Sequence, residues 1–278
     1  MTMSHLQPVV VKVGGKAIDD ARSLRALAAS LARAAASAPI IVVHGGGVAV
    51  DRRLAGREIR RVAGLRVTPP DQIDIIADVL GREVNGALVE AINRAGRPAV
   101  GLTLDKAMAT ARVLRGPAGE DLGRVGELTG GDPGALRALL AEGVTPVVAC
   151  IGRDADGPLN INADTAAAGV ARFTGAVLVV LLTDAPGVLD GQGAVIGRLD
   201  SVAIDELIAG GVIHGGMIPK VRAAMDVARS SGAPALIASW ADPDALALAL
   251  EGGGAGTRVC AAPGPERRRA SGVAPAPA

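Results

Sequence analysis

Short apolar runs, many of them β-branched, alternate along this chain with longer segments that have helical periodicity. Residues 8–13, 40–43 and 176–182 are almost continuously apolar, which is typical of strands covered on both faces of a parallel sheet. Residues 20–36, by contrast, place leucines three or four positions apart, as on one face of a helix. The alternation predicts an α/β fold, a three-layer αβα sandwich around a mainly parallel central sheet.

The same patterns predict where the elements lie. We expect strands at residues 8–13, 40–43, 99–102, 145–149, 176–182, 235–238 and 257–259. Helices are expected at residues 20–36, 48–55, 70–95, 133–141, 162–174, 201–209, 218–231 and 242–250. Residues 106–128 contain the turn formers Gly116, Pro117 and Gly119, which favours β-hairpins there.

The alternation of strands and helices restarts in the second half of the chain. With 278 residues, the chain is long enough for one large domain or for two lobes that share a sheet. We expect an N-terminal lobe of residues 1–174 and a C-terminal lobe of residues 175–260. Residues 261–278 hold four prolines and the run Arg267–Arg269, so we expect a disordered tail there.

Charge and cysteine content exclude several classes of function. The net charge is +1, from 29 basic and 28 acidic residues, which argues against nucleic acid or an anionic membrane as a partner. No apolar run approaches the ~20 residues that cross a bilayer. Two cysteines, Cys150 and Cys260, cannot form a disulfide framework or a Cys-rich zinc site. Because residues 1–13 also lack the pattern of a signal peptide, we expect a cytoplasmic protein.

Lysine is rare in this chain, and its positions are informative. Only four of the 29 basic residues are lysine, and two of them, Lys12 and Lys220, stand beside glycine-rich turns. Arginine cannot replace lysine where a compact ammonium group must reach a single phosphate oxygen. Lys220 also falls in the first turn of a predicted helix, where a cation opposes the helix dipole. This placement points toward an anionic ligand.

Two glycine-rich loops follow the first two predicted strands. Ligands of α/β folds bind at the carboxyl ends of strands, and Gly14 and Gly15 would let backbone N–H groups approach an anion there. The alternative is an ordinary glycine turn beside a surface lysine. The second strand ends in His44 and three glycines, a loop open to a small ligand, with His44 interpreted as a structural hydrogen-bonding residue. Neither a dinucleotide-binding fingerprint nor a P-loop motif occurs.

Several polar residues mark further candidate positions. Arg66 lies between apolar residues, and a guanidinium group can bind a carboxylate through two hydrogen bonds. Asn160 and Asn162 would lie on one side of an extended segment, and Asp164 would follow in the first turn of a helix. A helix cap explains Asn162 and partly Asp164, but it does not explain Asn160.

Taken in order, these residues resemble the acetylglutamate kinases of the amino-acid kinase superfamily. The resemblance covers about residues 8–260 and rests on the strings VVKVGGKAI, VVHGGGVAVD, GLRVTPPDQIDI, LNINADTAA, LLTDAPGVLD and GGVIHGGMIPKV. It implies transfer of the γ-phosphoryl group of ATP to the side-chain carboxylate of N-acetyl-L-glutamate, a step of arginine biosynthesis. It also implies that the N-terminal lobe binds acetylglutamate and that the C-terminal lobe binds ATP.

The resemblance assigns roles to individual residues. Lys12 and Lys220 would neutralise charge on the transferring group, and Asp164 would hold both lysines in position. Acetylglutamate would be bound by Gly46, Gly47, Asn160 and Arg66, with Arg66 on the α-carboxylate. The nucleotide would be bound by Gly14, Gly15, Asp184, Ala185, Pro186, Gly187, Val188, Leu189, Val212, Ile213 and His214. Mg²⁺ would arrive on the phosphates of ATP, with no metal site of the protein itself.

The start of the first strand bears on assembly. It lies near residue 9, which leaves no room for the N-terminal helix that links arginine-inhibited hexameric members of the family. We therefore expect a homodimer without strong feedback by arginine. The sequence departs from the family pattern at Ala185 and Pro186 in the predicted nucleotide loop.

Other functions stay open at this point. A sibling kinase acting on another acidic amino-acid derivative, such as an aminoadipate-type or carrier-protein-linked substrate, fits most of the same motifs. A nucleotide-binding regulator without catalysis is a second alternative, which the presence of Lys12, Asp164 and Lys220 disfavours. An NAD-dependent oxidoreductase lacks its glycine pattern.

Overall fold

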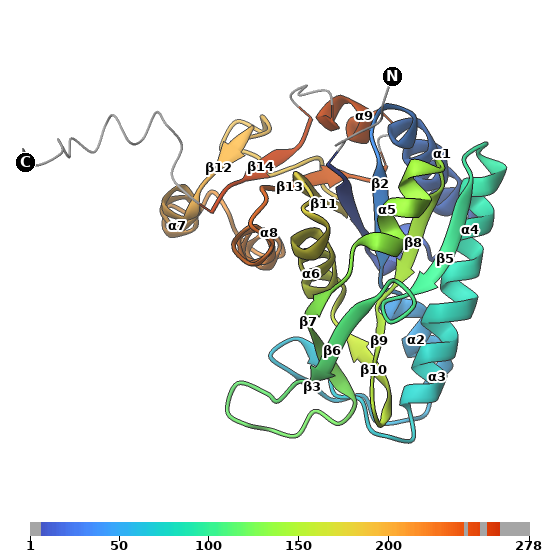
Figure 1. The fold of residues 1–278 in the computed structure, drawn as a ribbon. Coiled ribbons are helices and arrows are strands. Elements are labelled where there is room, and N and C mark those ends of the chain that lie inside the picture. The colour runs from blue at the N-terminus through green and yellow to red at the C-terminus, as the bar shows by residue number, and fades with distance from the viewer. Residues whose placement is uncertain (1–6, 242–243, 251–254, 262–278) are drawn as a thin grey trace, which may run out of the picture.

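The computed structural model describes residues 7–241, 244–250 and 255–261, and its centre is a single large sheet (Figure 1). All neighbouring strands of this sheet are parallel except β13 and β14, which confirms the predicted fold class. In spatial order the eight strands are β12 (Arg198–Leu199), β14 (Thr257–Val259), β13 (Ala235–Ser239), β11 (Leu178–Thr183), β1 (Val9–Val13), β2 (Ile40–His44), β8 (Thr145–Ala149) and β5 (Ala99–Thr103).

Helices cover both faces of the sheet and form the outer layers. One face packs against α1 (Ala21–Ser37), α4 (Asn85–Arg94) and α9 (Ala245–Leu250). The other packs against α5 (Gly134–Ala141), α6 (Ala163–Thr174), α7 (Ser201–Ala209) and α8 (Met217–Ser231). Because side chains alternate along a strand, Val9, Val11 and Val13 of β1 enter the first layer and Val10 the second. Lys12 shares the face of Val10, which directs it toward α6.

The segment predicted as one helix over residues 70–95 is more complex. It comprises α3 (Ile73–Asp78), a π-helical segment (Val79–Val84) and α4. Single π turns inside α-helices are rare and change the direction in which side chains point. Here Leu80 and Val84 pack against Gly46 in the loop after β2, whereas Leu88 of α4 packs against the large sheet. Through the π segment, one continuous helix therefore contributes side chains to two separate clusters of the core.

A smaller sheet lies beyond the carboxyl ends of β2 and β8 (Figure 1). Its strands are β6 (Ala109–Val113), β7 (Val125–Gly131), β10 (Gly157–Ile161) and β9 (Ile151–Asp154). Strands β6 and β7 form the expected antiparallel hairpin. The β9–β10 hairpin was not predicted, because both of its strands are short and only partly apolar.

A two-residue hairpin stands beside the small sheet. Strands β3 (Arg61–Val62) and β4 (Leu65–Arg66) pair antiparallel, and the turn residues Ala63 and Gly64 have φ values of 48° and 81°. Positive φ at both turn positions suits the right-handed twist of a hairpin. The short helix α2 (Gly47–Arg53) faces this hairpin, since its Asp51 pairs with Arg61 and Arg66.

The two predicted lobes share the large sheet. Strand β1 pairs with β11 over its full length, from Val9 opposite Leu178 to Val13 opposite Leu182. The division at residues 174 and 175 stays a prediction. The predicted disordered tail lies outside the described residues, apart from Ala261. Within the described ranges, no helix is both long and apolar enough to span a bilayer.

Candidate active site

A cavity of about 180 Å³ opens where the glycine loop after β2, the β3–β4 hairpin and β10 meet. Four residues predicted to bind acetylglutamate line it: Gly46, Gly47, Arg66 and Asn160. They come from three segments that are far apart in the sequence. The fold thus assembles this group of predicted residues around one cavity.

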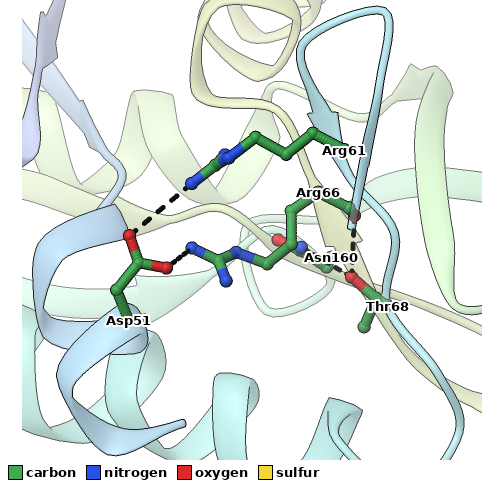
Figure 2. A network of polar contacts seen from close by, with 5 residues as sticks. All are labelled: Asp51, Arg61, Arg66, Thr68 and Asn160. Atoms are coloured by element: carbon green, nitrogen blue, oxygen red, sulfur yellow. Dashed lines mark hydrogen bonds and ion pairs between the residues drawn. The ribbon is translucent and has the colours of Figure 1, made fainter. Parts of the chain in front are cut away.

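Arg66 is held against helix α2 by Asp51 (Figure 2). Its side chain is only 8% exposed, and its Nη2 donates to Asp51 Oδ1. The other Asp51 oxygen lies 3.5 Å from Nη2 of Arg61, so one carboxylate is shared by two guanidinium groups. Arg66 Nη1 is buried and has no hydrogen-bond partner among the described residues. An unpaired buried donor is costly, typically about 1–3 kcal/mol, and an anion in the cavity would satisfy it.

Asn160 is tied to Arg66 through Thr68 (Figure 2). The Thr68 hydroxyl donates to the Arg66 carbonyl oxygen at 3.1 Å and accepts from Asn160 Nδ2 at 2.9 Å. Thr68 is fully buried. Gly123 passes so close that a Cβ there would lie 2.2 Å from the Thr68 carbonyl oxygen, and its φ of +66° also favours glycine. This contact fixes the spacing between the segment after the β3–β4 hairpin and the segment that leads into β7.

Lys12 and Asp164 form an ion pair at the end of β1. Lys12 Nζ lies 3.0 Å from Asp164 Oδ1, and the two side chains are 20% and 31% exposed. A Cβ at Gly14 would lie 3.9 Å from the same Nζ, so the ammonium group reaches back over the first glycine loop, which continues into a 3₁₀ turn (Gly15–Ala17). A Cβ at Gly15 would lie 3.4 Å from Gly47 N, which shows that the two glycine loops touch.

Cys150 lines the cavity but is not suited to nucleophilic chemistry. Burial raises the pKa of its thiol to about 12, while Lys12 lowers that pKa and Asp164 raises it. The thiol therefore stays protonated at neutral pH.

Lys220 pairs with a different carboxylate from the one expected. Its Nζ lies 2.5 Å from Asp184 Oδ1, and the side chains are 33% and 47% exposed. No ion pair joins Lys220 to Asp164 in the part of the chain that the structure describes. The expected arrangement, with Asp164 holding both lysines, is therefore not the one observed. Asp164 pairs with Lys12, and Lys220 pairs instead with Asp184, which directly follows β11 and lies within its reach.

The loop after β11 is ordered by two threonines. Thr183 Oγ1 accepts from Ala185 N at 3.0 Å, and Thr257 Oγ1 accepts from Val188 N at 2.7 Å. A Cβ at Gly187 would lie 2.8 Å from Thr257 Oγ1. Of the predicted nucleotide residues, Gly187 and Val188 thus contact strand β14, which β13 separates from β11 in the sheet.

The second predicted nucleotide segment connects α7 and α8. Val212 N and Ile213 N both donate to the Leu207 carbonyl oxygen, at 2.9 and 3.0 Å. Ile213 is buried and His214 is exposed. The roles of both segments toward a nucleotide stay predictions.

Sequence reasoning missed three residues that organise these groups. Asp51 and Thr68 lie inside strings that carry the resemblance, but their types alone fit a solvated helix face and a strand residue. Thr257 is separated from Val188 by 69 positions, and no local pattern links them. Among the described residues, no group of three or more His, Cys, Asp or Glu side chains is arranged to hold a metal ion.

Comparison with known proteins agrees with this fold. The model of the amino acid kinase family matches residues 7–239. Among solved structures, carbamate kinase from Giardia lamblia bound to AMP-PNP has a TM-score of 0.63 at 17% identity, covering 94% of this chain and 100% of that one. N-acetylglutamate synthase from Neisseria gonorrhoeae, complexed with coenzyme A and N-acetyl-glutamate, has a TM-score of 0.77 at 22% identity, covering 93% of this chain and 60% of that one. The chain belongs to the amino acid kinase family.

Curated relatives narrow the assignment. Acetylglutamate kinase of Vibrio cholerae serotype O1 is 43% identical over 264 residues, which cover 93% of this chain and 99% of the relative. Acetylglutamate kinase of Pectobacterium atrosepticum is 40% identical over 261 residues, covering 92% of this chain and 100% of the relative. Within the family, the chain belongs with the acetylglutamate kinases, which confirms the resemblance found in the sequence.

Proposed function

We propose that this protein transfers the γ-phosphoryl group of ATP to the side-chain carboxylate of N-acetyl-L-glutamate. The products are N-acetylglutamyl 5-phosphate and ADP, and the reaction belongs to arginine biosynthesis. The chain is thus a phosphotransferase with a carboxyl group as acceptor. Its near full-length relatives named acetylglutamate kinase support this function.

The unpaired Nη1 of Arg66 is the observation that carries the proposal. It is a buried cationic donor beside a small cavity, and its neighbour Nη2 is already occupied by Asp51. A carboxylate is the ligand that a guanidinium group binds best. We assign the α-carboxylate of acetylglutamate to Arg66, with Asn160 and the backbone of Gly46 and Gly47 around the rest of the molecule.

The transfer itself needs charge and alignment more than proton transfer. The attacking side-chain carboxylate is ionised at neutral pH, so no general base is required. A bond forms between a carboxylate oxygen and the γ-phosphorus as the bond to the ADP oxygen breaks, with no covalent enzyme intermediate. Lys12 and Lys220 reduce the repulsion between two anionic reactants, and Asp164 fixes the ammonium group of Lys12.

The nucleotide would occupy the other end of the site. Gly14 and Gly15 would donate N–H groups to its phosphates, and the two segments at residues 184–189 and 212–214 would contact its adenosine part. Lys220 would exchange Asp184 for a phosphate oxygen when ATP binds. Because that ion pair is half-exposed, separating it costs little.

Magnesium would enter with ATP, held chiefly by the phosphates. The residues here fit that arrangement, since the carboxylate of Asp164 is already paired with Lys12. When bound, the ion would neutralise part of the phosphate charge.

The homodimer, the cytoplasmic location and the two-lobe division remain predictions from the sequence. Size-exclusion chromatography with light scattering, with and without arginine, tests the first: an arginine-sensitive hexamer would refute it.

An acyl-phosphate assay tests the function. Protein and Mg-ATP are mixed with N-acetylglutamate, N-acetylaminoadipate, glutamate or aspartate, and the product is trapped with hydroxylamine. We expect turnover with N-acetylglutamate and little with the other acids. Lys220→Ala should lower kcat by roughly 10²- to 10³-fold, by analogy with losing one oxyanion donor. Lys106→Ala, at an exposed lysine outside the site, is the matched control.

Each outcome of this assay bears on a separate part of the proposal. Absence of hydroxamate from N-acetylglutamate with wild-type protein would refute the proposed reaction. Faster turnover with N-acetylaminoadipate would reassign the substrate. Near wild-type turnover by Lys220→Ala would remove Lys220 from the mechanism.

A further inference from the structure

His44 is buried at the end of β2, directly before the glycine loop that lines the cavity. Its Nδ1 lies 2.9 Å from the Gly45 carbonyl oxygen, and its Nε2 lies 3.0 Å from Asn85 Nδ2. The side chain does not line the cavity, so it has no direct contact with a ligand there. The imidazole ring instead contacts the backbone of the loop at the Gly45 carbonyl oxygen.

Asn85 connects this histidine to a second strand and to the π segment. It is 3% exposed, and its Nδ2 also donates to the Val147 carbonyl oxygen of β8 at 2.9 Å. Asn85 begins α4, immediately after the π segment. One amide group therefore uses both of its hydrogens to join β8 to the histidine behind the loop.

Hydrogen-bond chemistry fixes the state of the histidine. A carbonyl oxygen only accepts, so Nδ1 must carry the hydrogen and donate it to Gly45. Nε2 then has a lone pair and accepts from Asn85. Burial lowers the pKa of His44 to about 4, in agreement with a neutral ring.

The π segment also contacts the loop directly. A Cβ at Gly46 would lie 2.7 Å from Leu80 Cδ2 and 3.2 Å from Val84 Cγ2, and both side chains belong to that segment. The loop is thus supported by side-chain packing at Gly46 and by the histidine at Gly45. The two supports meet where the π segment ends, at Asn85.

We propose that His44 and Asn85 are positioning residues, which hold the Gly45 carbonyl so that the N–H groups of Gly46 and Gly47 keep their direction toward acetylglutamate. The inference rests on the proposed function only for the identity of the ligand. It predicts that disturbing Asn85 from a distance raises the KM for acetylglutamate, even when no residue of the cavity is changed.

Gly101 offers such a disturbance. A Cβ at Gly101 in β5 would lie 1.9 Å from Asn85 Oδ1, so Gly101→Ala forces the amide group to move. Gly86→Ala is the matched control, because Gly86 is adjacent to Asn85 and a Cβ there meets nothing within 4 Å. We expect Gly101→Ala to raise the KM for acetylglutamate about tenfold, with kcat and the KM for ATP changed less than about threefold. Gly86→Ala should leave all three constants unchanged.

A second pair of variants separates positioning from general stability. In His44→Asn the amide nitrogen can take the place of Nδ1, which keeps the bond to Gly45. In His44→Gln the amide reaches the place of Nε2, which keeps the bond to Asn85 and loses the bond to Gly45. We expect a larger rise in the KM for acetylglutamate with glutamine than with asparagine, whatever their order in Tm.

Hydrogen exchange of the Gly45 amide, which donates to the Val13 carbonyl oxygen at 3.3 Å, decides the inference without a substrate. Faster exchange in Gly101→Ala than in Gly86→Ala supports it. Equal exchange and equal KM in the two glycine variants would overturn it. If wild-type protein does not phosphorylate acetylglutamate, the proposed function fails, and the exchange comparison still tests the positioning role.

Discussion

The proposed acceptor side and the proposed nucleotide side of the site are built differently. Around the cavity, Asp51 and Thr68 connect segments from distant parts of the chain, and Arg66 Nη1 is left as an unmet buried donor among the described residues. On the nucleotide side, Lys220 is already paired with Asp184, and the pair is half-exposed. The proposed acceptor side is therefore organised before a ligand arrives, whereas on the proposed nucleotide side Lys220 would have to leave Asp184 to bind a phosphate.

The largest effect is expected where the two sides meet. Lys12→Ala removes an ammonium group beside the first glycine loop, which touches the second, and kcat should fall by roughly 10²- to 10³-fold. Acyl-hydroxamate formation at saturating substrates measures it, with Lys106→Ala as the control. A rise in the KM values with unchanged kcat would assign Lys12 to substrate binding alone and would contradict the distinction between the two sides.

Arg66→Ala should act on the acceptor side only. Losing a charge-assisted hydrogen bond to a carboxylate costs about 1.5–3 kcal/mol, so the KM for acetylglutamate should rise roughly 10- to 100-fold. The KM for ATP should stay within about twofold. Arg94→Ala, at an arginine that is 75% exposed on α4, is the control. Equal changes in both KM values would contradict the separation.

The buried histidine gives the acceptor side a dependence on pH. The pKa of His44 is about 4 in the folded protein and near 6.5 when unfolded, so the unfolded chain binds a proton first as pH falls. Stability contributed by the neutral ring is complete above pH 6.5 and is lost toward pH 4. Between pH 7.5 and 5 the loss should be about 2 kcal/mol.

Urea unfolding at the two pH values measures this loss. His44→Asn has no titrating ring, so its stability should change about 2 kcal/mol less over the same interval. An identical change in the variant and the wild type would show that His44 does not titrate differently on folding.

The smallest effect concerns the β3–β4 hairpin. Ala63 has a φ of 48°, which glycine adopts without strain. Ala63→Gly should relieve that strain, and the KM for acetylglutamate should fall by less than about twofold, since the hairpin carries Arg66. A titration with acetylglutamate measures the KM of Ala63→Gly. Gly56→Ala is the comparison variant, because Gly56 also has a positive φ, +85°, but lies in open space outside the cavity.

Local patterns in the sequence were enough to predict seven of the eight strands of the large sheet, because most of these strands are buried apolar runs. Strand β12 was not predicted, because it has only two residues and one of them, Arg198, is exposed. The Asn162 cap of α6 was also predictable, since it accepts from Asp164 N and Thr165 N as a cap should. The lysine bias singled out Lys12 and Lys220. The resemblance to the acetylglutamate kinases then identified the residues that line the cavity.

Contacts over long distances in the chain were not predictable in the same way. The partner of Lys220 depends on how far Asp184 extends from β11, which no spacing shows. The tie from Asn160 to Thr68 spans 92 positions. The π segment has the same apolar composition as an α-helix, so its extra residue is visible only in the backbone.

That extra residue affects how the length of this chain can vary. Within a regular α-helix, deleting one residue rotates all that follows by about 100°. A deletion inside α4 before Leu88 would therefore turn Leu88 and Ile92 away from the sheet. Deleting one position between Val79 and Val84 would instead remove the residue that the π turn absorbs and restore an ordinary helical turn, so α4 would keep its orientation.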